Sequence, residues 1–191
     1  MKRGFGIVVL LLCVASRVSH AHIPLVAEPE LEVESPEVSH AIYGTLHGDD
    51  DELFVFRLRY DEPFALPFEL LVPRRRALAE HRPAFAVVGP GLPAPTADER
   101  ALLPRPVPEG MGVLVERSDE PERLVIFESF TRRAFWSSGP IALALEAGEH
   151  EIWVFSPEGT AGDFVMAFGV EEDFSDVGCG ELAGDWPRYA Y

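Results

Sequence analysis

Apolar and polar side chains alternate with a period of two along most of the chain from residue 41 to residue 170. In LFVFRLRY, residues 53–60, every second side chain is a large apolar one, while Arg57 and Arg59 fall on the opposite face. This alternation is typical of a β-strand with one buried face. The same reasoning predicts strands at residues 41–46, 53–60, 64–72, 84–89, 111–117, 124–128, 141–145, 150–156 and 163–170.

Short segments rich in Gly, Pro and Asp separate these strands, and helical signals are few. RRRALAEHR, residues 74–82, has the composition of one or two helical turns, and Thr96 and Glu99 have the spacing of a capping box. Pro67 predicts an edge position or a bulge in its strand. The fold class that we predict is all-β, a single antiparallel β-sandwich (jelly-roll-like) of about eight or nine strands with one or two short helical turns.

The two ends of the chain lack this alternation. Residues 1–21 begin with two basic side chains, continue with an apolar run at 7–14, and end with Ser19 and Ala21 at the positions that signal peptidases read. The run is shorter than the ~18 residues of a membrane span, so no transmembrane segment is predicted in the mature chain. We expect a signal peptide (1–21), an extended lead-in (22–40), a sandwich domain (41–171) and an acidic, Gly-containing tail (172–191), in a secreted or periplasmic protein.

Acidic side chains outnumber basic ones, with 32 Asp and Glu against 16 Lys and Arg and a formal net charge of −16. Removal of residues 1–21 takes away three cations and no acid. Such a surface repels nucleic acid and anionic lipid, so we expect a protein or carbohydrate partner instead. Cys13 leaves with the signal peptide and Cys179 remains alone, which excludes an internal disulfide in the mature chain.

Two stretches resemble a known bacterial domain. AIYGTLHGDDDELFVFRLRYDEPFALPFELLV, residues 41–72, and LEAGEHEIWVFSPEGTAGDFVMAFGV, residues 145–170, resemble the opening and the close of the prepeptidase C-terminal (PPC-type) β-sandwich domain. Between them, residues 73–136 depart from the compact pattern of that family with a Pro-rich insertion. The resemblance implies a stand-alone, non-catalytic accessory or binding module of exported proteins, some of which look like carbohydrate-binding or calcium-associated sandwiches.

Cleavage after Ala21 would make His22 the first residue of the mature chain. Its α-amine and imidazole, with a second imidazole, would supply three nitrogens in an arrangement that suits Cu(II). The candidates for the second imidazole are His40, His47, His81 and His150. The alternative is that His22 is simply the residue after the cut, and both interpretations stay open.

The acidic run at residues 49–52 offers the oxygen ligands that calcium prefers, with Asp49 and Asp51 as the candidates. The run lacks the spacing of an EF-hand, and a solvated hairpin tip explains it equally well. The metal hypotheses thus involve His22, His40, His47, Asp49 and Asp51. We predict no resident cofactor and keep calcium and copper as alternatives.

Three aromatic residues are candidates for a ligand-binding platform: Tyr43, Trp136 and Trp153. A flat ring that faces water can stack on a sugar or on a protein partner, whereas core packing is the other use of such side chains.

The chain has no GxSxG or HExxH motif, so we predict that it is not an enzyme. The leading hypothesis is an exported, non-catalytic binding or interaction module. The alternatives are a small copper-binding protein that uses His22 and a hydrolase with paired carboxylates.

Overall fold

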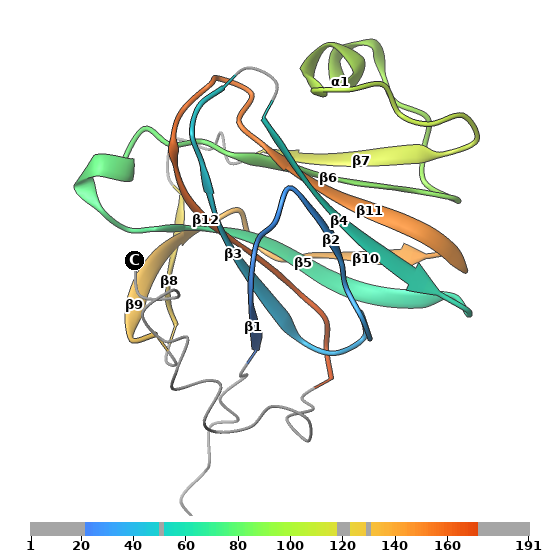
Figure 1. The fold of residues 1–191 in the computed structure, drawn as a ribbon, viewed down its shortest axis with the longest axis horizontal. Coiled ribbons are helices and arrows are strands. Elements are labelled where there is room, and N and C mark those ends of the chain that lie inside the picture. The colour runs from blue at the N-terminus through green and yellow to red at the C-terminus, as the bar shows by residue number, and fades with distance from the viewer. Residues whose placement is uncertain (1–21, 50–51, 118–122, 129–130, 172–191) are drawn as a thin grey trace, which may run out of the picture.

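The computed structural model describes residues 22–49, 52–117, 123–128 and 131–171, which form two β-sheets packed face to face (Figure 1). Sheet A contains, in order, β1 (Ile23–Val26), β3 (His40–Leu46), β12 (Gly162–Phe168), β5 (Phe64–Pro73), β9 (Arg133–Ser137) and β8 (Leu124–Glu128), with β10 (Ile141–Leu145) also paired to β5. Sheet B contains β2 (Glu30–Glu32), β4 (Leu53–Tyr60), β11 (Gly148–Phe155), β6 (Ala84–Gly89) and β7 (Gly112–Arg117).

The all-β sandwich that the sequence predicts is confirmed, and each of the nine predicted strands is present. Three further strands, β1, β2 and β9, bring the number in the described residues to twelve instead of eight or nine. The sheets are mixed rather than antiparallel throughout, because β1 runs parallel to β3 and β2 runs parallel to β4.

The parallel pairs arise from the lead-in, residues 22–40. Its first part lies along β3 in sheet A, with Ile23 opposite His40, and its second part crosses to sheet B, where Leu31 lies opposite Phe56. This segment contributes an edge strand to each sheet.

The core lies between the inner faces of the two sheets. The alternation in residues 53–60 places Phe56 and Leu58 in this core, at 0% and 1% exposure. Phe68 of β5 and Phe164 of β12 face them from sheet A and are fully buried. Each buried ring contributes about 2–3 kcal/mol of hydrophobic stabilisation relative to an exposed one.

Pro67 lies in β5 at a position where its missing N–H is tolerated. It pairs with Ala142 of β10, and the ladder between β5 and β12 ends one residue away, at Phe68. The expectation of an edge-like position for this proline agrees with that register.

Part of the outer face of sheet B is covered by the segment between β6 and β7. This segment contains α1 (Ala97–Leu102), and Leu103 packs with Trp153 and Val55 in a second apolar cluster. The predicted capping box is confirmed: Glu99 N donates to Thr96 Oγ1 at 3.2 Å, and Thr96 N donates to the Glu99 carboxylate at 2.7 Å. The other predicted helical turn is the 3-10 helix η1 (Arg76–Leu78).

Several predictions concern residues that the structure does not describe. They are the signal peptide (1–21), the tail (172–191), Asp51 and Cys179. Within the described ranges, no helix has both the length and the apolar character needed to cross a membrane.

Candidate functional site

Three of the histidines proposed for a metal site, His22, His40 and His47, lie at two different ends of β3. Of the others, His81 follows η1 and His150 lies in β11, and both are buried. His22 Nδ1 is hydrogen-bonded to Ser39 Oγ at 2.6 Å. His40 is 5% exposed, and its Nε2 donates to the carbonyl of Ser35 at 3.1 Å. His47 follows the last residue of this seven-residue strand, about 20 Å away along β3. His22 and His40 therefore cannot share one ion with His47.

His47 is instead paired with a carboxylate of its own loop. Its Nδ1 lies 2.7 Å from Glu52 Oε1, and its backbone N–H donates to the other oxygen of Glu52. The hydrogen bond to Glu52 raises the pKa of the His47 imidazole. Gly48 N donates to the same carboxylate, and Asp49 adds a further negative charge nearby. Among the residues that the structure describes, no three His, Cys, Asp or Glu side chains are grouped closely enough to hold a metal ion.

The three aromatic candidates differ in burial. Tyr43 is 6% exposed on the outer face of sheet A, and Trp153 is fully buried, so neither ring presents a face to solvent. Trp153 is covered by Arg105, whose guanidinium carbon lies 4.4 Å from the ring centroid. Trp136 is half-buried, and the Arg123 guanidinium carbon lies 4.0 Å over its ring. The structure does not bring these three rings together into one platform.

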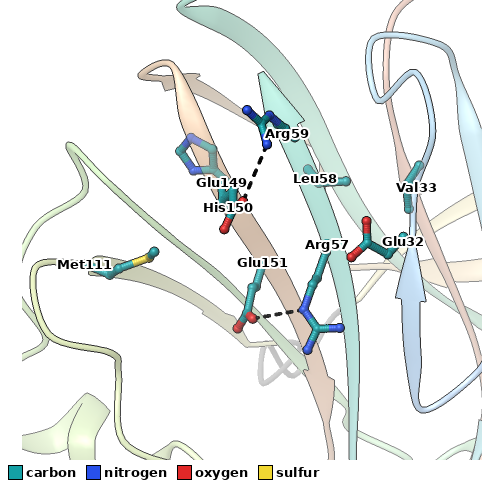
Figure 2. A pocket seen from close by; sticks show the side chains of 9 residues that line it. All are labelled: Glu32, Val33, Arg57, Leu58, Arg59, Met111, Glu149, His150 and Glu151. Carbon is teal, nitrogen blue, oxygen red and sulfur yellow. Dashed lines mark ion pairs between the residues drawn. The ribbon is translucent and has the colours of Figure 1, made fainter. Parts of the chain in front are cut away.

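A hollow of about 190 Å³ lies on the outer face of sheet B and is lined by charged side chains of both signs (Figure 2). The register of β4 and β11 places Arg57 opposite Glu151, with 3.6 Å between the charged groups. Arg59 lies opposite Glu149 at 3.8 Å. Arg105 approaches Glu151 more closely, at 2.6 Å.

Each arginine in this hollow therefore faces a glutamate of the same protein. Such cross-strand pairs stabilise a sheet by about 0.2–1 kcal/mol each, and they leave little unbalanced charge for a ligand. The hollow is thus explained as a structural ladder of ion pairs.

Strand β8 differs from the rest of the surface because its large apolar side chains are exposed. The described residues contain five exposed large hydrophobic side chains, and three of them lie on β8. Leu124 is 53% exposed, Val125 is 46% exposed and Phe127 is 68% exposed. Exposed apolar groups gathered in this way mark interaction surfaces more often than isolated ones do.

Strand β8 is also the last strand of sheet A on its side. It pairs with β9 through residues 124–128, and within the described residues no strand lies along its other edge. Figure 1 shows the β8–β9 hairpin on the side of the sandwich away from α1. An open strand edge presents N–H and C=O groups that can pair with another chain.

Three of the other outer strands, β1, β2 and β10, carry features that discourage such pairing. The remaining one, β7, ends with the charged residues Glu116 and Arg117. Strand β1 contains Pro24, which has no N–H to donate, and strand β2 consists of Leu31 between two glutamates. The exposed side chains of β10 are alanines. In β8, the sequence LVIFE offers four consecutive apolar residues before its first charge. We therefore take β8, with the neighbouring Arg123 and Trp136, as the candidate functional site.

Sequence reasoning predicted the strand at 124–128 but not its place in the sheet. Four consecutive apolar residues are typical of a strand buried on both faces, so the sequence alone favours a central position. The exposure follows from the sheet order, in which β9 separates β8 from β5. The backbone of Arg132, with a φ of 56°, marks the turn into β9, but such a turn indicates only that β8 and β9 are neighbours and not that β8 is an edge strand.

No protein-family model matches this sequence, and a sequence comparison with curated proteins finds no match. Several solved structures are similar to the chain, among them the following two. One is PliG from Aeromonas hydrophila, a periplasmic inhibitor of g-type lysozyme, at 11% identity and a TM-score of 0.39, covering 78% of this chain and 100% of that one. The other is the pre-peptidase C-terminal domain of a collagenase from Bacillus anthracis, at 8% identity and a TM-score of 0.36, covering 78% of this chain and 97% of that one.

The second structure is of the domain type that residues 41–72 and 145–170 resemble in sequence.

Proposed function

We propose that this protein is an exported, non-catalytic module, built on one β-sandwich domain, that binds another protein along strand β8. The observation that carries the proposal is the coincidence of an open strand edge with three exposed large apolar side chains. An extended segment of a partner can add to such an edge through backbone hydrogen bonds, while pockets and apolar contacts select its side chains.

A protein partner fits this surface better than a carbohydrate. Sugar binding would use an open aromatic face, but Tyr43 and Trp153 are buried and Arg123 lies over Trp136. The backbone edge of β8, in contrast, has the hydrogen-bonding pattern of another polypeptide. Export is part of the proposal because residues 1–21 have the pattern of a signal peptide.

The proposal is tested with Phe127→Lys, since Phe127 is 68% exposed and its replacement does not alter the core. The new charge lies at one end of the apolar strip of β8, which consists of Leu124, Val125 and Phe127. The immobilised protein and the variant are exposed to the exported proteins of the producing cells, and retained proteins are quantified by mass spectrometry. We expect a partner that wild type retains at least about tenfold better than Phe127→Lys.

Val170→Lys is the matched control, because Val170 is 53% exposed and lies beyond the end of β12 rather than on β8. It is expected to retain the partner as wild type does. Equal retention by wild type and Phe127→Lys would contradict the proposal, and so would a loss that Val170→Lys shares.

A further inference from the structure

Two arginines meet beside the start of β8 and share the same pair of backbone carbonyls. Arg82 Nη1 donates to the carbonyls of Ala79 and His81 at 2.6 and 3.3 Å. Arg123 donates to the same two oxygens, from Nη2 at 2.8 Å and from Nη1 at 3.0 Å. Both side chains are half-buried, so two positive charges lie side by side in a partly desolvated place.

A second feature of the pair is that it lacks a close counter-ion among the described residues. Within the described residues, no carboxylate lies within 4.0 Å of either guanidinium, although Arg57, Arg59 and Arg105 all have such a partner. Burial, and then the charge of Arg82, lower the pKa of Arg123 to about 10, and the more distant Glu80 only partly offsets them. A guanidinium has five N–H donors, so each arginine keeps donors beyond those used by the carbonyls.

The arginine pair is continuous with the apolar strip of β8. Arg123 directly precedes Leu124, and its guanidinium lies 4.0 Å over the ring of Trp136. Trp136 in turn lies opposite Val125 in the β8–β9 ladder. A guanidinium that stacks on an aromatic ring and donates to two carbonyls is fixed in position. This favours a pair of parallel hydrogen bonds from its N–H groups to the two oxygens of a carboxylate.

From these contacts we infer that Arg82 and Arg123 form a carboxylate-binding corner that receives an acidic side chain of a protein segment docked along β8. The inference rests on the proposed function and specifies its partner as an extended apolar segment that ends in a negative charge. Nucleic acid is a poor source of the anion, because the chain as a whole carries a formal charge of −16.

The test uses three labelled peptides of about six residues with alternating Val and Thr. One has Asp at its C-terminal end, one has Asp at its N-terminal end, and one has Asn at both places, with the termini blocked in all three. Fluorescence anisotropy measures their affinity for the protein. The arginine pair lies at the N-terminal end of β8. A peptide that docks parallel to β8 brings its N-terminal end to this pair, and an antiparallel peptide brings its C-terminal end, so one acidic peptide is made for each direction.

We expect one acidic peptide to bind about tenfold more tightly than the Asn peptide, which is the effect of one charge-assisted hydrogen-bonded pair. The negative charge of the protein works against this preference, so general electrostatic attraction cannot produce it. Arg123→Gln and Arg82→Gln should each remove the preference and leave the affinity for the Asn peptide unchanged. Arg59→Gln, on the outer face of sheet B and 75% exposed, is the matched control and should keep the preference.

The affinities of the acidic and Asn peptides for the wild-type protein test the preference for a carboxylate even where a variant does not fold. Equal binding of acidic and Asn peptides, lost in Phe127→Lys, would overturn the carboxylate corner and leave the proposed docking at β8 standing. Binding of none of the peptides up to about 1 mM would overturn both.

Discussion

His81 is 2% exposed and is packed against Gly162 of β12, with its Nδ1 3.1 Å from Thr160 Oγ1. Burial lowers the pKa of His81 to about 4, because an imidazolium loses its hydration there. Burial also lowers the pKa of His40, which is 5% exposed. Both side chains are therefore neutral in the folded protein near neutral pH.

This burial predicts a loss of stability in mild acid. The unfolded chain protonates His81 near pH 6.5, but the folded protein does so only near pH 4, so the unfolded state binds more protons between these values. His81 should lower the free energy of unfolding by roughly 2 kcal/mol between about pH 7 and about pH 5, and His40 should act in the same direction. Urea denaturation at the two pH values measures this loss.

His81→Gln should flatten this pH dependence, since the amide does not titrate. His47→Gln is the control, because exposed His47 has a raised pKa and cannot contribute a loss in acid. If the free energy of unfolding fell equally on acidification in wild type and in His81→Gln, the burial of His81 would not be the cause of that fall.

The sequence predicts on which face of a strand a side chain lies. It does not predict which distant residues pack over that side chain. The alternation in β11 places Trp153 on the same face as Glu151, which predicts an outward ring. The ring is nevertheless buried, because Arg105, 46 residues earlier than Glu151, pairs with that glutamate and lies over the indole. Period-two patterns describe neighbours along one strand and contain no information about such distant contacts.

At the scale of elements, α1 is the one that local sequence specifies most fully. Thr96 and Glu99 exchange side-chain and backbone hydrogen bonds, which satisfy two N–H groups that a helix start leaves unpaired. Leu103, at the end of the helix, is 9% exposed and packs on sheet B. The capping box thus fixes the helix that helps to cover Trp153.

Removal of the Thr96 side chain that caps α1 should destabilise this helix and the protein. Thr96→Ala is expected to lower the free energy of unfolding by about 1 kcal/mol, because Glu99 N loses its acceptor. Thr96→Ser keeps the hydroxyl and should stay close to wild type. Chemical denaturation compares the two variants, and equal stability of both would contradict a role for the cap.

The strands that the sequence did not reveal are those whose partners lie far away or whose pattern is broken. Strand β1 contains Pro24 and is ordered by its parallel partner β3, and β2 has only three residues. In and just before β9, the adjacent pairs Arg132–Arg133 and Phe135–Trp136 interrupt any alternation. These segments are extended because of the sheets beside them, and local propensity contributes little.

At the scale of the whole molecule, the two sheets bury their inner faces against each other, and three of the four apolar side chains of β8 are left in solvent. The strand itself was predictable, whereas its open edge follows from the order of strands in sheet A. The arginine pair beside it was not predictable, because Arg82 and Arg123 meet only through the carbonyls of Ala79 and His81.

Hydrogen exchange of the backbone amides of β8 tests the central claim most directly. The exchange rates of residues 124–128 are compared in the free protein and with the tightest of the three peptides, and β7, an edge strand of sheet B, is the internal reference. We predict that the bound peptide slows exchange in β8 by about tenfold or more and leaves β7 unchanged. Unchanged exchange in β8 while the peptide is bound would contradict the claim that this edge is the binding site.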